Sequence, residues 1–152
     1  MTKPTGTVRL HRVLKTTPEK IYKAFIDPEA VVKFYPPYGF TAKVYKMDAK
    51  VGGECHMHFT NFGTGKSHSF KNKYVEMVPG KLLRYKDSFD DPNLPGEMQV
   101  TLSLRKVSVG TELEIVQEGI PAIIPVEACY LGWQETLCQL AHVVEPEIPD
   151  GF

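Results

Sequence analysis

The stretch that decides the fold is residues 125–146, PVEACYLGWQETLCQLAHVVEP. Its apolar positions are spaced alternately four and three residues apart: Val126, Tyr130, Trp133, Leu137, Leu140 and Val144. This spacing is the stripe of an amphipathic helix. Pro125 suits a helix start and Pro146 a helix end. About twenty residues at about 1.5 Å each make a rod of roughly 30 Å, which is long enough to cross a sheet.

The sequence before this helix alternates apolar and polar residues in short runs separated by glycine and proline, a pattern typical of β-strands. The predicted strands are Thr7–Leu14, Phe40–Met47, Glu54–Phe62, His68–Val78, Leu82–Phe89, Met98–Val107 and Glu112–Glu118. Two short helices are predicted from Thr17-Pro18-Glu19 and Asp27-Pro28-Glu29, because each places a capping side chain before a proline and an acid. Strands in hairpin order form an antiparallel sheet. We therefore predict a single α+β domain over residues 1–152, a helix-grip fold in which a curved sheet of six or seven strands wraps around the C-terminal helix.

The charge balance excludes several classes of protein. Lys plus Arg and Asp plus Glu number 18 each, so the net charge is zero, whereas proteins that coat nucleic acid or anionic membranes are usually basic. No run of 18 apolar residues is present, and the polar start of the chain lacks the apolar core of a signal peptide. We expect a cytoplasmic protein that binds no nucleic acid and does not insert into membranes.

The cysteines and histidines indicate no metal or cofactor. The three cysteines form no CxxC or Cys/His zinc pattern, so we expect reduced thiols. His56 and His58 lie two residues apart and could share a metal such as zinc. The alternation around them turns Cys55, Met57 and Phe59 inward, so both histidines are expected to face solvent.

A ligand pocket is expected between the sheet and the C-terminal helix, because a cylinder fills a curved trough incompletely. In residues 68–78, Lys71 and Lys73 must face water, which turns the alternate set of side chains toward the helix. That set is partly polar, and buried polar groups are costly unless they are partnered or line a wet cavity. The inward positions of this strand, of later strands and of the helix form the predicted pocket: His68, Phe70, Asn72, Tyr74, Glu76, Tyr85, Asp87, Phe89, Gln117 and Trp133.

Residues 119–125, GIPAIIP, form an apolar connection where loops are usually polar. A lid over the pocket mouth would explain this composition. Part of a homodimer surface would explain it equally well, since exposed apolar patches often mark contacts.

Five short motifs follow one another along the chain: Thr17–Phe25 with Asp27–Glu29, Val51–Glu54, Tyr74–Pro79, Asp87–Phe89, and Gly132-Trp133 followed by Leu137 and Leu140. In this order and spacing they resemble the START/birch-pollen-allergen (SRPBCC) superfamily. Within it the chain is similar to the bacterial family homologous to the C-terminal domain of the heat-shock-protein ATPase activator. The match spans nearly the whole chain. The resemblance implies the helix-grip fold and a scaffold used by ligand carriers, cyclases, hormone receptors and chaperone regulators.

Three functions are consistent with these residues. The first is non-enzymatic binding of a small, largely apolar molecule. The second is a cyclase- or hydratase-type enzyme that uses the same pocket, with His68 and either Glu76 or Asp87 as an acid–base pair. The third is a chaperone or stress-response module that meets a chaperone partner through its surface; we expect this chain, which starts at its first strand, to lack the N-terminal domain of chaperone-activating relatives. We expect binding rather than catalysis, because no nucleophile, base and orienting group can be identified together.

Overall fold

The computed structural model describes residues 5–90 and 96–151. The elements follow in the order β1 (Thr5–Leu14), α1 (Pro18–Phe25), α2 (Pro28–Phe34), β2 (Phe40–Met47), β3 (Glu54–Asn61), β4 (Ser67–Val78), β5 (Leu82–Phe89), β6 (Met98–Val107), β7 (Gly110–Pro121) and α3 (Val126–Val144). In these residues seven strands form one antiparallel sheet in the order β1-β7-β6-β5-β4-β3-β2. The predicted α+β helix-grip fold is confirmed.

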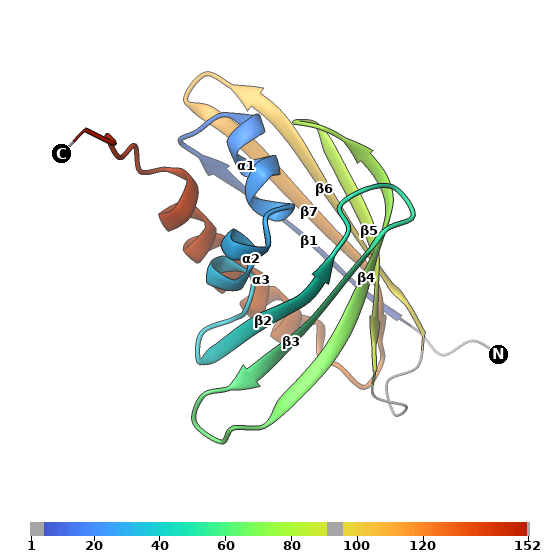
Figure 1. Ribbon diagram of the computed structural model, residues 1–152. Coiled ribbons are helices and arrows are strands. Elements are labelled where there is room, and N and C mark those ends of the chain that lie inside the picture. The colour runs from blue at the N-terminus through green and yellow to red at the C-terminus, as the bar shows by residue number, and fades with distance from the viewer. Residues whose placement is uncertain (1–4, 91–95, 152) are drawn as a thin grey trace.

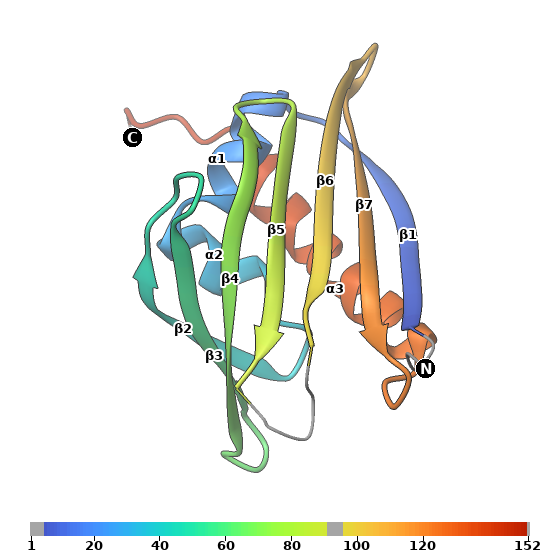
Figure 2. The same cartoon turned by 90° about the vertical axis from the view of Figure 1, so that its right-hand side faces the viewer.

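The helices all lie on the concave side of the curved sheet (Figure 1). Figure 2 views the sheet from its outer side, with β2 at one edge and β1 at the other, and α3 runs obliquely behind the strands toward α1. Within the described ranges, no helix combines the length and the apolar character that crossing a membrane requires.

The two short helices begin where the capping residues predict. The Thr17 hydroxyl accepts a hydrogen bond from the backbone N–H of Lys20, and Asp27 Oδ1 accepts from the N–H groups of Glu29 and Ala30. Each cap satisfies backbone donors that the first helical turn leaves free. Both helices therefore start at fixed positions above the sheet.

One end of the trough is filled by a dense apolar core. Fully or nearly fully buried side chains come from α1, from α2 and from the C-terminal half of α3: Ile21, Phe25, Val31, Phe34, Leu137, Leu140 and Val144. α3 contacts α1, α2 and β1, and the buried residues of its C-terminal half belong to this core. The N-terminal half of α3 covers the other end of the trough.

The strands at one sheet edge are longer than the alternation pattern predicts. β1 begins at Thr5 and β7 extends to Pro121, because Thr5 pairs with Pro121 and Gly6 with Ile120. Apolar residues that the sequence places in a connection are therefore partly in a strand.

Candidate ligand-binding site

A cavity of about 310 Å³ lies between the sheet and the N-terminal half of α3. It falls at the lower end of the size range of small-molecule sites. The trough is thus packed at the end covered by α1 and α2 and hollow at the other.

The α3 side of the cavity leaves open space because the side chains that line it there are small. Ala128, Gly132 and Thr136 lie four residues apart on α3, so they share one face of the helix, and all three line the cavity. Around the Cβ position that Gly132 lacks, the nearest atom is Pro37 Cγ at 3.8 Å, which is ordinary contact distance. Trp133, beside this row, is buried and lines the cavity.

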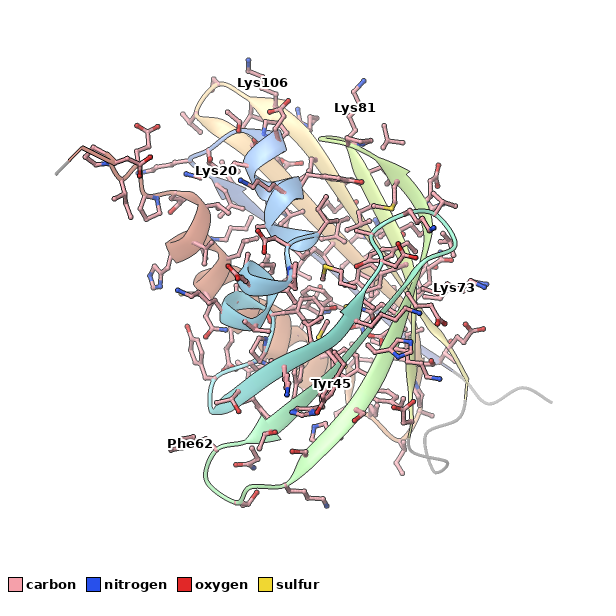
Figure 3. All side chains as sticks on the ribbon, viewed as in Figure 1. Lys20, Tyr45, Phe62, Lys73, Lys81 and Lys106 are labelled. Carbon is pink, nitrogen blue, oxygen red and sulfur yellow. The ribbon has the colours of Figure 1, made fainter. Side chains whose placement is uncertain are left out.

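The sheet wall is mostly aromatic. Three phenylalanines line the cavity: Phe59 of β3, Phe70 of β4 and Phe89 of β5. The rings of Phe59 and Phe70 pack edge to face, with 4.8 Å between their centroids. Lys73, on the alternate set of β4, points away from the helices (Figure 3). The alternation therefore turns apolar rings inward along this part of the sheet.

Polar groups deep in the cavity mostly bond to one another. The Trp133 indole N–H donates to Gln117 Oε1 at 2.8 Å, and Gln117 Nε2 donates to the sulfur of Met98 at 3.4 Å. The Thr136 hydroxyl donates to the backbone carbonyl of Tyr35 at 2.8 Å. These bonds satisfy donors that would otherwise be costly to bury.

Asp87 is the exception among these polar groups. Its side chain lines the cavity and is only 8% exposed, and its Oδ1 is fully covered without a hydrogen-bond partner in the described residues. Burial disfavours the charged form and raises the pKa of this carboxyl to about 7. Asp87 therefore changes charge near neutral pH inside a largely apolar cavity.

A second, much smaller cavity of about 10 Å³ lies nearby, with room for about one water molecule. Tyr35 borders both cavities, and its hydroxyl is hydrogen-bonded to that of Tyr85 at 2.5 Å. Asn72 and Tyr74 also line the small cavity, and Asn72 Oδ1 is covered and has no hydrogen-bond partner among the residues that the structure describes. Asn72 lies directly opposite Asp87 in the β4–β5 ladder, so the two unpartnered groups stand on neighbouring strands.

The prediction that Glu76 faces the pocket is wrong. The register of β4 against β5 shifts between Tyr74 and Glu76, which leaves Val75 unpaired and reverses the side-chain alternation beyond it. Glu76 accordingly lies on the outer face, where it accepts a hydrogen bond from Arg84 at 2.6 Å. The predicted acid–base pair of His68 with Glu76 is therefore not formed.

The predicted pocket residues consequently fall into three groups. Those around the large cavity are His68, Phe70, Asp87, Phe89, Gln117 and Trp133, and those around the small one are Asn72, Tyr74 and Tyr85. Glu76 lies outside both. His68, expected to face the interior, is exposed and stands at the cavity mouth, where its ring contacts Phe40.

Several lining residues are absent from the predicted set. Tyr35 follows α2 directly, and its place beside the sheet depends on how α2 packs. Met98 is the first residue of β6, is buried and lines the large cavity. The sequence does indicate Ala128, Gly132 and Thr136 as lining residues, because they are small residues spaced four apart on the predicted helix.

The apolar segment 119–125 contributes to the cavity wall. Ile120 is buried in β7, and Ile124 lines the large cavity. Ile123 is 76% exposed. The segment thus closes one side of the cavity and leaves one large apolar side chain in solvent.

His56 and His58 point outward, as the alternation predicts. His56 Nε2 lies 3.2 Å from Glu54 Oε1, and His58 Nδ1 is hydrogen-bonded to the Tyr45 hydroxyl. In the portion of the chain that the structure describes, no three His, Cys, Asp or Glu side chains are grouped as a metal site would require.

Comparison with known proteins gives a family and a set of structural relatives. The family model described as "Activator of Hsp90 ATPase homolog 1-like protein" matches residues 15–145. A crystal structure of a protein from Chromobacterium violaceum is 54% identical, with a TM-score of 0.91, covering 93% of this chain and 98% of that one. A Rhodobacter sphaeroides protein is 19% identical with a TM-score of 0.78, covering 90% of each chain, and shows a shared fold alone. No curated protein matches the sequence.

Proposed function

This chain belongs to the family of Activator of Hsp90 ATPase homolog 1-like proteins, and we propose that it binds a small, largely apolar molecule in the cavity between the sheet and α3. The resemblance that the sequence motifs indicated is confirmed by the family match. The observation that carries the proposal is the 310 Å³ cavity itself, with aromatic rings on one wall and small side chains on the other.

An apolar ligand fits the physical character of this cavity. A dry cavity of about 150 Å³ lined by apolar side chains is large enough to bind benzene. The cavity under α3 is about 310 Å³, and its lining includes three Phe side chains together with Met98, Ile124 and Trp133. Filling it with an apolar molecule restores dispersion contacts that the lining atoms lack and removes apolar surface from water.

Binding is favoured over catalysis by the arrangement of titratable groups. The pair of His68 and Glu76 is excluded, since Glu76 is engaged with Arg84 on the outer face. His68 stands at the exposed mouth, while Asp87 is buried in the wall. A reaction would require a base within hydrogen-bond reach of the proton it removes, and a deep acid with an exposed histidine fits ligand recognition better.

Replacing Gly132 with leucine tests the proposal by filling the cavity. The added side chain has room at its Cβ and enters the space next to Trp133. We expect the affinity for 1-octanol, a neutral probe of suitable size, to fall at least tenfold by isothermal titration calorimetry. Stability should not fall, because leucine is favoured over glycine in a helix by up to about 1 kcal/mol.

The matched control is Gln134→Leu, which adds a leucine at an exposed position of the same helix. This variant should bind 1-octanol as the natural chain does. Equal affinity of the natural chain and Gly132→Leu would contradict binding in this cavity, as would the absence of 1-octanol binding to the natural chain.

A further inference from the structure

The Asp87 carboxyl lacks a partner that a ligand could supply. Its side chain lines the cavity and is more than nine-tenths buried, and the described residues donate no hydrogen bond to its Oδ1. A buried polar group without a hydrogen bond is costly. Because Oδ1 itself is covered, a ligand group in the cavity would donate a hydrogen bond to the other oxygen, Oδ2, and so stabilise the charged form of this carboxyl.

Two other polar groups of the wall, Trp133 and Thr136, use their donors within the protein. The Trp133 N–H is taken by Gln117 Oε1 and the Thr136 hydroxyl proton by the Tyr35 carbonyl. Amide and hydroxyl oxygens each have two lone pairs, so Gln117 Oε1 and Thr136 Oγ1 can accept a further bond. Besides the second N–H of Gln117 Nε2, the wall therefore offers acceptors at Gln117, Thr136 and Asp87, and a ligand that donates hydrogen bonds is complementary to these acceptors.

The charges around the cavity also favour a ligand that donates hydrogen bonds. Among the described residues that line it, none is lysine or arginine, and His68 stands at the exposed mouth. No cation deep in the cavity is thus available to hold a carboxylate ligand, which would also face the Asp87 carboxylate. Like charges repel strongly where the effective dielectric constant is low.

On the basis of the function proposed above, we propose that the cavity selects a small apolar amine, whose ammonium group pairs with the Asp87 carboxylate. Hydrogen bonds between two charged groups are roughly twice as strong as neutral ones. The apolar body of the amine would occupy the space between the aromatic sheet wall and the small residues of α3. The volume of about 310 Å³ exceeds the about 150 Å³ that binds benzene, so it leaves room for an amine with an apolar chain.

Asp87 is the group that changes charge on binding. Titratable side chains reach this region from β3, β4, β5, α3 and the residue after α2: Cys55, His68, Tyr74, Tyr85, Cys129 and Tyr35. From β6 and β7 the neighbours are Met98 and Gln117, which do not titrate. Burial raises the pKa of Cys55 to about 11 and raises the pKa values of the three tyrosines and of Cys129 above their ordinary values, so these groups are neutral near pH 7.

Three probes that differ only in their polar group test the assignment. We expect the natural chain at pH 8 to bind octylamine at least tenfold more tightly than 1-octanol, and octanoate more weakly than 1-octanol, by isothermal titration calorimetry. In Asp87→Asn, the preference for octylamine over 1-octanol should disappear. The ranking in the natural chain tests the assignment even without the variant.

The pH dependence gives a second readout. With the pKa of Asp87 at about 7 in the empty cavity, the carboxyl must release a proton to bind an ammonium group at lower pH. Lowering the pH from 8 to 6 should therefore weaken octylamine about tenfold and leave 1-octanol nearly unchanged. His68→Gln separates the exposed histidine from Asp87, and the tenfold effect should persist in it.

The outcomes separate this inference from the proposed function. If 1-octanol binds but octylamine shows no advantage, or if the advantage persists in Asp87→Asn, the amine assignment is wrong and cavity binding stands. If none of the three probes binds, both proposals fail.

Discussion

Replacing Asp87 with asparagine is expected to stabilise the protein more at pH 8 than at pH 5, with a difference of about 3 kcal/mol between the two effects. The ordinary pKa of an aspartate in an unfolded chain is about 3.9. In the folded chain burial raises the pKa of Asp87 to about 7. Between these values the folded state holds a proton that the unfolded state has released, so the free energy of unfolding decreases as the pH rises.

The size of the effect follows from this pH window. The contribution of Asp87 is fully present below about pH 4, falls by about 1.4 kcal/mol per pH unit, and is lost once the pH has passed about 7. The range from pH 5 to pH 7 covers two pH units, so across it the contribution of Asp87 to the free energy of unfolding falls by about 3 kcal/mol. Asparagine has nearly the same shape and does not titrate, so its free energy of unfolding lacks this term.

Urea unfolding of both chains at pH 5 and pH 8 measures the difference. The control is Asp90→Asn, which removes a carboxylate three residues along the chain at an exposed position. We expect this variant to change stability by less than about 0.5 kcal/mol, as is usual for a surface substitution. An Asp87→Asn effect that does not grow with pH would show that the carboxyl is ionised at little cost, and the role given to it here would fail.

Replacing Phe34 with alanine is expected to destabilise the protein by about 3–5 kcal/mol, the range for truncating a fully buried phenylalanine. The Phe34 side chain has no exposed surface. The centroid of its ring lies 5.0 Å from that of Phe25 and 6.3 Å from that of Tyr35. Its carbonyl accepts a hydrogen bond from Gln139 of α3 at 3.1 Å. The loss therefore affects the packing that joins α1, α2 and α3.

The matched control uses the same substitution at a residue in solvent. Phe62, in the turn between β3 and β4, is 81% exposed and points away from the molecule (Figure 3). Surface substitutions usually change stability by less than about 0.5 kcal/mol, and we expect Phe62→Ala to do so in urea unfolding. Similar losses from both variants would contradict the packing of α2 under α3.

The elements of the fold could be predicted because each has a local signature. The spacing of four and three from Val126 to Val144 predicts α3, and the structure starts the helix one residue later than predicted because Pro125 is its N-cap. The caps Thr17 and Asp27 predict the two short helices, and their hydrogen bonds are present. In both cases the residues that decide the structure are close together in the sequence.

The site could be predicted only in part, because its shape depends on contacts between distant residues. Alternation alone cannot reveal the unpaired Val75, so it places Glu76 on the wrong face. The cavity exists because the small residues Ala128, Gly132 and Thr136 lie opposite large rings on the sheet. In the sequence, neither the small residues of the helix nor the aromatic residues of the strands show that the other set will lie opposite. Asp87 was predicted to face inward, but its lack of a partner depends on every neighbour that packs around it.

Binding in the cavity can be tested most directly through the indole N–H of Trp133. Trp133 is the one tryptophan of the chain, lines the cavity and donates to Gln117, so its side chain gives a single indole signal in a proton–nitrogen correlation spectrum. On titration with 1-octanol we predict that this signal and the amide signals of Phe70, Phe89 and Gly132 shift together, while those of Lys81 and Lys106, at the end of the sheet near α1 (Figure 3), stay in place. An unchanged indole signal at saturating 1-octanol, or shifts confined to the outer face, would contradict binding between the sheet and α3.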